Sequence, residues 1–311
     1  MSDLPDSAAE RARRFDQQHA RRLRALAYRM LGSRAEAEDI VQEAWLRWAE
    51  VDEAVVQNAG AFLSRLVTHL CLDQLRSATA RREQYVGVWL PEPLLEDEDL
   101  FGWAPGPEQQ AEFAQDLSVA FLLALERLSP LERAAFLLHD VFDLDYDEIA
   151  RHLDRAEASC RQLVSRARRH VKGDYARREV AKEEADRLVQ AFMTAVRSHD
   201  VAALARLLAE DAVMLADGGG KVSAVRRPLQ GGARIAQVFI AFAQLPAGRG
   251  WRLVPTRVNG LPGCLVLDDT QGGRLVQTIA LAPAPEPGRL GAMYIQRNPD
   301  KLQALERKLA G

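Results

Sequence analysis

The sequence predicts a multidomain fold in which two all-α domains are followed by an α+β domain with a curved antiparallel sheet. Residues 13–82 and 108–184 repeat apolar side chains at helical spacing. Residues 85–109 separate these two stretches with clustered prolines and glycines. Beyond residue 180, helical segments give way to short β-like runs between glycines. A chain of 311 residues accommodates two or three compact domains.

The composition is that of a globular protein, with 48% hydrophobic residues. Its three cysteines, Cys71, Cys160 and Cys264, lie far apart and form no CxxC pair. This pattern argues against a disulfide framework and a zinc site, and it fits a reducing cytoplasm. The sequence shows no apolar leader and no stretch of membrane-spanning length. We therefore expect a cytoplasmic protein that does not bind a membrane and holds no metal or cofactor.

Charge is segregated along the chain, although the formal net charge is only −3. Arginine collects in residues 11–29, 76–82 and 155–178, whereas acidic residues collect in 92–99 and 140–148. Such segregation creates basic faces that can bind nucleic acid even in a nearly neutral protein. Charge alone does not exclude ordinary solvated helix surface.

Residues 10–84 are expected to form the first helical domain. Gly32 ends one helix, and Ser33 with Glu36 forms a capping box that begins the next. A third helix begins near Ala59. The buried stripes of the three helices are predicted to be Leu23, Leu26, Ala27, Met30 and Leu31, then Ile40, Val41, Ala44 and Trp48, then Phe62, Leu63, Leu66, Val67 and Leu70.

Two outward stripes of this domain are candidate binding surfaces. An acidic and partly apolar stripe on the second helix suits docking to a basic helical partner. A polar and basic stripe on the third helix can hold unstacked bases and the backbone of single-stranded DNA, although a solvated helix face explains it too. The first stripe consists of Asp39, Gln42, Glu43 and Leu46, and the second of Arg65, Thr68, His69, Leu72, Asp73 and Arg76.

Residues 85–109 are expected to form a linker, because prolines and glycines prevent a continuous helix there. Apolar residues such as Trp89, Leu90, Leu94 and Leu95 are too numerous for a free spacer. We therefore expect this linker to dock on another part of the protein.

Residues 110–176 are expected to form the second helical domain. Ser129, Pro130 and Glu132 mark a helix start. Residues 145–171 have helix-turn-helix proportions, although a plain helical hairpin with a basic face has the same spacing. In a helix-turn-helix the second helix enters the major groove. Its outward side chains suited to bases or phosphates are Ser159, Arg161, Gln162, Ser165, Arg166 and Arg169.

Residues 180–311 are expected to form the α+β domain. Helices over 183–198 and 201–209 precede the strands, and a helix over 233–243 interrupts them. The expected strands span 212–216, 221–226, 251–258, 263–267, 274–280 and 290–296.

Four segments of the helical domains match motifs of one family. Residues 39–48 are similar to the polymerase-docking region 2.2 of extracytoplasmic-function (ECF) sigma factors, and residues 61–76 to their promoter-melting regions 2.3 and 2.4. Residues 128–133 and 161–168 resemble region 4, which reads the −35 element. The resemblance implies a sigma factor that brings core RNA polymerase, through its clamp region, to promoter DNA. It also implies that the stripe on the third helix holds the −10 strand.

Three further strings lie in the linker and the last domain: Trp89-Leu90-Pro91-Glu92-Pro93, Asp217-Gly218-Gly219-Gly220-Lys221 and Asn298-Pro299-Asp300-Lys301-Leu302. They resemble motifs of the ECF subgroup with a fused SnoaL-like domain, which is a cone with a pocket. The resemblance implies that this domain contacts the sigma regions and the linker in place of a separate anti-sigma protein. Two departures are Asp154, where the turn usually carries glycine, and Ala156, where the helix cap is usually serine.

A SnoaL-type enzyme fused to a DNA-binding module is the alternative reading. Catalysis would need a positioned acid or base inside the pocket. The candidates are weak, because His199 lies at a polar helix end, Asp268 and Asp269 at a turn, and Asp217 in a glycine-rich loop. No enzymatic activity is expected, whereas a small-molecule ligand in the pocket stays an open alternative.

The glycines before Lys221 also invite comparison with a P-loop. Leu215 stands where the first glycine should be, and Val222 replaces the serine or threonine. No nucleotide site is therefore expected. The glycines permit a tight loop or a close backbone approach, and Lys221 is available for a carboxylate.

Overall fold

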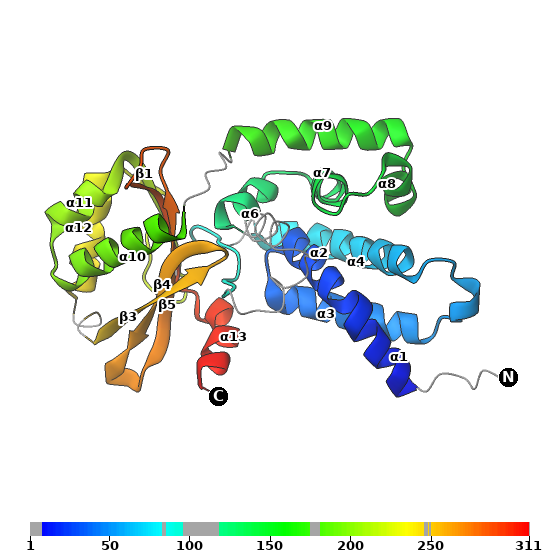
Figure 1. Ribbon diagram of the computed structural model, residues 1–311, viewed down its shortest axis with the longest axis horizontal. Helices are drawn as coiled ribbons and strands as arrows, with labels where there is room; N and C mark the ends of the chain where they lie inside the picture. Colours follow the sequence, from blue (N-terminus) through cyan, green and yellow to red (C-terminus); the bar gives the residue numbers. More distant parts are fainter. Residues whose placement is uncertain are drawn as a thin grey trace. The chain divides into compact units, whose positions relative to one another are not determined.

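The computed structural model describes residues 8–82, 85–95, 118–174, 181–245, 248 and 250–310. The expected linker beyond residue 95 and the start of the second helical domain lie outside the described residues. The chain divides into two compact units. The first contains residues 8–82 and 120–174 and is helical, and the second contains 85–95, 118–119 and 181–310 and is α+β (Figure 1). The predicted order, helical domains before an α+β domain, is confirmed.

The helical unit begins with a three-helix core. Its elements are α1 (Ala8–Phe15), η1 (Asp16–Ala20), α2 (Arg21–Leu31), α3 (Arg34–Ala49), η2 (Glu53–Val55) and α4 (Ala59–Arg82). Gly32 ends α2 with a left-handed φ of 69°, and the Ser33 side chain accepts a hydrogen bond from the Glu36 amide at the start of α3. Both boundaries agree with the sequence prediction.

The second half of this unit contains the two helices with helix-turn-helix spacing. Its elements are α6 (Val119–Glu126), α7 (Pro130–Phe136), η3 (Leu137–Val141), α8 (Tyr146–Leu153) and α9 (Glu157–Asp174). Ser129 and Glu132 form a complete capping box at α7. Between α8 and α9, Asp154 adopts a left-handed conformation with φ 52°, which glycine adopts more readily.

One buried arginine joins the two halves of the helical unit. Arg133 of α7 is 3% exposed, and its Nη1 donates to the Met30 carbonyl of α2 at 2.6 Å and to Glu126 Oε1 at 2.7 Å. Burial lowers the pKa of Arg133 to about 10. A buried charge is tolerated when it is paired and hydrogen-bonded, so these contacts hold α2, α6 and α7 in one arrangement.

The α+β unit is built on a six-stranded sheet with the order β2-β1-β6-β5-β4-β3. Among the described strands, β1 and β6 pair in parallel and the other pairs are antiparallel, so the expectation of an antiparallel sheet is wrong for this one pair. The last strand returns beside the first after a long crossover, which allows parallel pairing. The elements are α10 (Lys182–Arg197), α11 (Val201–Leu207), β1 (Leu208–Asp217), β2 (Leu229–Gln230), α12 (Gly232–Ala243), β3 (Trp251–Val258), β4 (Leu261–Asp268), η5 (Asp269–Gln271), β5 (Arg274–Pro283), β6 (Leu290–Gln296) and α13 (Pro299–Ala310).

Two other features of this unit differ from the prediction. Residues 221–226 form turns and irregular backbone instead of a strand, because the Gly218 carbonyl closes a tight turn by accepting hydrogen bonds from the amides of Lys221 and Val222. The unit also ends with α13, which the strand-rich pattern did not predict.

Helices α10, α11 and α12 lie together against one face of the sheet (Figure 1). Their shared core includes Phe192, Ile235, Phe239, Ile279 and Met293. Helix α13 contacts β5 and buries Leu302 and Leu305 outside that cluster, whereas its Leu309 is exposed. Among the described residues, no helix is both long enough and apolar enough to cross a membrane.

We predict that Arg133→Met destabilises the helical unit by about 3–5 kcal/mol, because Glu126 would lose its buried partner. Urea unfolding followed by circular dichroism measures this free energy. Arg127→Met, at an exposed position one turn from α7, is the matched control and should change it by less than about 0.5 kcal/mol. Equal effects of the two substitutions would contradict the role given to Arg133.

Candidate functional site

The predicted docking stripe lies on the outer side of α3. Asp39, Gln42, Glu43 and Leu46 are all exposed, and Leu46 is 58% exposed despite its apolar side chain. These residues follow the i, i+3, i+4, i+7 spacing of one helix face, here named the α3 face. Trp48, in contrast, is only 4% exposed and packs on Phe62 with ring centroids 5.5 Å apart.

The predicted single-strand stripe of α4 is narrower than expected. Arg65, Asp73 and Arg76 are exposed and His69 is half-buried, and we name these four residues the α4 face. Thr68 and Leu72 were expected on it, but both are buried. The Thr68 hydroxyl donates to the Ser64 carbonyl at 2.8 Å. The reason is that α4 contacts α2 and α3 as well as α7 and α8, so less of its circumference stays exposed.

The α4 face is in contact with the turn between α8 and α9. Arg65 Nη2 lies 2.5 Å from Asp154 Oδ1, and His69 Nε2 lies 3.5 Å from Asp154 Oδ2. Asp154 is the residue that stands at the left-handed turn position. The Asp154 carboxylate therefore contacts two of the four side chains of the α4 face.

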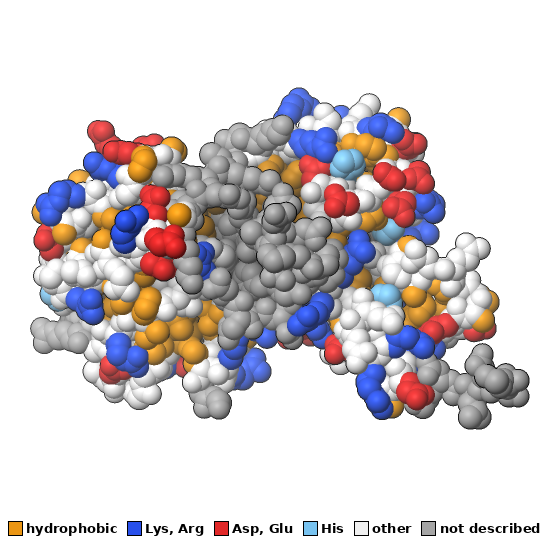
Figure 2. Space-filling model, in the orientation of Figure 1, with side chains coloured by type: hydrophobic (Ala, Val, Ile, Leu, Met, Phe, Trp, Pro, Cys, Tyr) orange, Lys and Arg blue, Asp and Glu red, His pale blue; other side chains and the backbone are white. Residues whose placement is uncertain are grey.

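The predicted reading helix is α9. Arg161, Gln162, Ser165, Arg166 and Arg169 are exposed and are named the α9 face, whereas Ser159 is half-buried. Basic side chains are visible over α9 in Figure 2, with acidic side chains nearby.

Two arginines of α9 are held by neighbouring side chains. Arg161 pairs with Glu157 one turn earlier and lies over the Tyr146 ring, 4.3 Å from its centroid. Arg168 pairs with Asp140 at 2.6 Å, and this carboxylate raises the pKa of the guanidinium. These contacts fix the positions of two positive charges along the helix.

A second site lies in the α+β unit, where the linker docks on Asp217. This carboxylate is completely buried. It accepts hydrogen bonds from the Tyr85 hydroxyl at 2.6 Å and from the Leu90 amide at 2.9 Å. It also accepts from the Gly219 amide at 2.9 Å and from the Lys301 ammonium at 2.7 Å. Linker, glycine loop and α13 therefore meet at one buried negative charge.

Lys301 and its neighbours complete this linker-docking cluster. The Lys301 ammonium donates to the Leu90 carbonyl at 2.6 Å and lies 4.4 Å from the centroid of the Trp89 ring. Gln296 Nε2 donates to the carbonyls of Leu90 and Pro91 at 3.3 and 3.2 Å. In the same string, Pro91 and Pro93 are buried and Glu92 is half-buried.

The glycine loop approaches its neighbours too closely for side chains. A Cβ atom on Gly219 would lie 2.4 Å from the Asn298 carboxamide, and one on Gly218 would lie 2.4 Å from the Val222 carbonyl. A Cβ atom on Gly220 would lie 3.0 Å from Val86 of the linker. The three motifs thus lie against one another, and Asn298 also donates to the Tyr85 hydroxyl at 2.9 Å.

The rest of the third motif begins the last helix. Half-buried Pro299 is the first residue of α13, and Asp300 pairs with Lys221 at 2.6 Å. Both charged side chains are exposed, so this ion pair contributes about 0–1 kcal/mol.

A second anchor for the linker was not predicted from the sequence. The Leu94 amide donates to the Asn259 side chain at 3.2 Å, and the Asn259 amide donates to the Leu94 carbonyl at 2.8 Å. Asn259 and Gly260 both have positive φ at the turn between β3 and β4. The Asn-Gly pair is a strong signal for such a hairpin turn, but it does not indicate what the turn binds. Tyr85 and Gln296 were missed in the same way.

Asp268 and Asp269, which were considered as catalytic residues, make contacts that stabilise the local structure. Asp268 accepts hydrogen bonds from Thr270 and Gln271, and Asp269 pairs with Arg252 at 3.1 Å. His199 has a left-handed φ of 52° after the end of α10. Within the described part of the chain, no group of three or more acidic, histidine or cysteine side chains is placed to bind a metal ion.

Comparison with known proteins agrees with the order of these segments. Residues 15–81 match the family model Sigma-70 region 2, and residues 118–171 match Sigma-70, region 4. The chain is 36% identical over 284 residues to the ECF RNA polymerase sigma factor SigJ of Mycobacterium tuberculosis, which covers 90% of this chain and 89% of SigJ. It is 29% identical over 310 residues to the "Probable ECF RNA polymerase sigma factor SigI" of the same organism, covering 99% and 98%.

The fold agrees as well. The crystal structure of Mycobacterium tuberculosis SigJ matches with a TM-score of 0.69 at 32% identity, covering 91% of this chain and 95% of that chain. Similarity in sequence and in fold thus extends over both the helical and the α+β units. The chain therefore belongs to the extracytoplasmic-function (ECF) RNA polymerase sigma factors.

Proposed function

We propose that this sigma factor starts transcription through three separate faces of its helical unit. The α3 face binds the clamp region of core RNA polymerase, the α4 face holds the melted −10 strand, and the α9 face reads the −35 element in the major groove. The observation that carries this proposal is that the residues of the three faces, apart from half-buried His69, are exposed on helices that also bury residues in the core. The polar and basic side chains of these faces do not pack in the core and are therefore available to bind partners.

The α4 face is occupied before it binds DNA. Arg65 and His69 have to leave Asp154 before they can contact a nucleic-acid strand. Arg65 and Asp154 are both about half exposed, at 48% and 59%, so solvent and salt weaken their attraction. The pair therefore acts as a weak and reversible restraint on the helical unit.

The docked linker supports a regulatory role for the α+β domain in place of a separate anti-sigma protein. Residues 83–118 connect α4 to α6, and residues 85–95 of this connection belong to the α+β unit. An extended chain spans roughly 3.3–3.6 Å per residue, so docking fixes a stretch whose fully extended length is roughly 36–40 Å. The strength of linker docking would therefore set how far these halves can separate on a promoter.

We predict that Arg161→Ala and Arg166→Ala each weaken promoter binding by about 1–3 kcal/mol, because each removes a side chain suited to bidentate base contact. Electrophoretic mobility shift with the reconstituted holoenzyme at fixed salt measures the change, and transcription by the same holoenzyme tests the whole proposal. Arg206→Ala, at an exposed position on α11, is the control. Unchanged binding by both α9 variants would exclude this helix as the reader.

We predict that Asp154→Asn raises promoter binding by up to about fivefold, the equivalent of about 1 kcal/mol, because asparagine tolerates the turn but frees Arg65. The gain should shrink as salt rises. Holoenzyme binding to a premelted promoter at two salt concentrations measures it. Asp147→Asn, which breaks the exposed Arg151 pair of α8, is the matched control. Equal effects of both substitutions at both salt concentrations would refute the restraint.

We predict that Asp217→Asn detaches the linker, because removing one partner of a buried ion pair costs about 3–5 kcal/mol. The rate of proteolysis within residues 85–95 should rise, and transcription from the holoenzyme should change. Asp300→Asn breaks the exposed pair with Lys221 in the same region and is the control. A linker that stays protected, together with unchanged transcription, would contradict the regulatory role.

A further inference from the structure

Arg161 is held on two sides, although it lies on the exposed α9 face. Its guanidinium carbon lies 4.3 Å from the centroid of the Tyr146 ring, well within the distance of a cation–π contact. Its Nε donates to Glu157 Oε1 at 3.1 Å, and its Nη2 donates to the same oxygen. The ring therefore covers the face of the guanidinium, and the carboxylate takes one edge.

These contacts leave a defined part of Arg161 unoccupied. A guanidinium carries five N–H donors, and Glu157 uses two of them. In the part of the chain that the structure describes, the remaining three have no hydrogen-bond acceptor. They lie on Nη1 and Nη2, at the outer edge of the plane. Two neighbouring donors on that edge form a fork that matches two acceptors side by side.

The Tyr146 ring is itself held from the other side of the helix-turn-helix. The ring of His139 in η3 lies 4.4 Å from it, and His139 Nδ1 lies 2.8 Å from Asp140 Oδ1. Asp140 in turn pairs with Arg168, two turns after Arg161 on α9. Tyr146 is therefore a fixed support for Arg161 and not a freely rotating ring.

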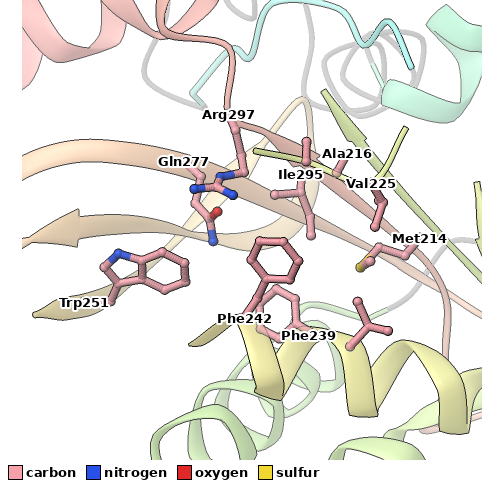
Figure 3. A pocket seen from close by; sticks show the side chains of 11 residues that line it. Met214, Ala216, Val225, Phe239, Phe242, Trp251, Gln277, Ile295 and Arg297 are labelled. Atoms are coloured by element: carbon pink, nitrogen blue, oxygen red, sulfur yellow. The ribbon is translucent and has the colours of Figure 1, made fainter. Parts of the chain in front are cut away.

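Another arginine beside aromatic rings, Arg297 of the α+β unit, differs in its surroundings. Its guanidinium carbon lies 6.0 Å from the ring centroids of Phe242 and Trp251, and Gln277 lies next to it (Figure 3). The cavity lined by these side chains has a volume of about 30 Å³, which is room for about one water molecule. The Arg161 side chain, in contrast, is 59% exposed, so a large partner can reach its free donors.

We propose, on the basis of the role proposed for the α9 face, that Tyr146 and Glu157 are positioning residues that direct the Nη1–Nη2 edge of Arg161 at a guanine of the −35 element. Guanine presents two acceptors, O6 and N7, in the major groove, whereas adenine presents one acceptor and one donor. A fork of two donors therefore fits guanine. Because Arg161 is ordered before it binds, it loses less rotamer freedom when it contacts the base.

The other basic residues of the α9 face lack this support. Among the described residues, Arg166 and Arg169 have no hydrogen bond, ion pair or aromatic contact of their side chains. Arg161 is also the fifth residue of α9, and the first residues of a recognition helix are those that contact base edges. Arg161 is therefore the arginine of this face that is prepared for one base.

Mobility shift with the reconstituted holoenzyme at fixed salt tests the proposal. The probe is a duplex that the wild-type holoenzyme selects from a random pool, with each base pair of its −35 element replaced in turn. We expect one G·C pair at which Arg161→Ala loses discrimination. Tyr146→Leu should lower discrimination at that pair by about two- to fivefold, the equivalent of a cation–π contact at an exposed site. Tyr146→Phe keeps the ring face and should retain it.

Two further measurements separate positioning from a general effect on the fold. In an Arg161→Ala background, Tyr146→Leu should cause no further loss of discrimination, because its effect passes through Arg161. Glu157→Ala changes an exposed side chain and should lower discrimination at the same pair, which decides the test if Tyr146→Leu unfolds the helical unit. Asp147→Ala, which breaks the exposed Arg151 pair of α8, is the matched control and should not change it. Circular dichroism checks the folding of each variant.

The outcomes distinguish this proposal from the role of the α9 face. If Arg161→Ala left discrimination unchanged at every base pair, both would be wrong. If Arg161→Ala lost discrimination while Tyr146→Leu and Glu157→Ala retained it, only the positioning role would be wrong. Loss at an A·T pair would overturn the assignment of guanine. Equal loss in Tyr146→Phe and Tyr146→Leu would show that the hydroxyl group acts, and not the ring face.

Discussion

The α+β unit depends on the pairing of one buried carboxylate with donors from three distant segments. Asp217 is completely buried, and the burial of an ionised group is unfavourable unless nearby donors replace its water shell. The linker, the glycine loop and α13 supply those donors. No one of these segments can leave without exposing the carboxylate or leaving it unpaired. Docking of the linker is therefore coupled to the arrangement of the end of the chain.

Local patterns in the sequence predicted much of the fold. Caps at Ser33, Ser129 and Gly32 fix helix ends through contacts within a few residues, so they can be read without knowing the fold. The same is not true of contacts between distant segments. Thr68 is buried because α4 has neighbours on more than one side, and helical periodicity carries no information about their number. The parallel pairing of β1 with β6 likewise depends on strand order.

The candidate sites show the same difference between local patterns, which the sequence reveals, and contacts between distant segments, which it does not. The α3 face follows from helical spacing, and all four of its residues are exposed as expected. Nothing in the sequence indicated the linker contacts of Tyr85 and Asn259, because their partners lie more than a hundred residues away in sequence. Asp154 shows how a departure from the family pattern can be reconciled with the fold. It adopts a conformation that suits glycine, and its carboxylate gains contacts with Arg65 and His69 that glycine could not make.

The segment that follows β6 has a consequence for the contacts of the linker. Gln296, Arg297 and Asn298 share consecutive peptide planes, and a rotation about the main-chain bonds at Arg297 reorients both neighbouring side chains. The carboxamides on either side are aimed at fixed carbonyl and hydroxyl groups, which tolerate little angular error. A change in the backbone at Arg297 would therefore alter the contacts of both Gln296 and Asn298 with the linker.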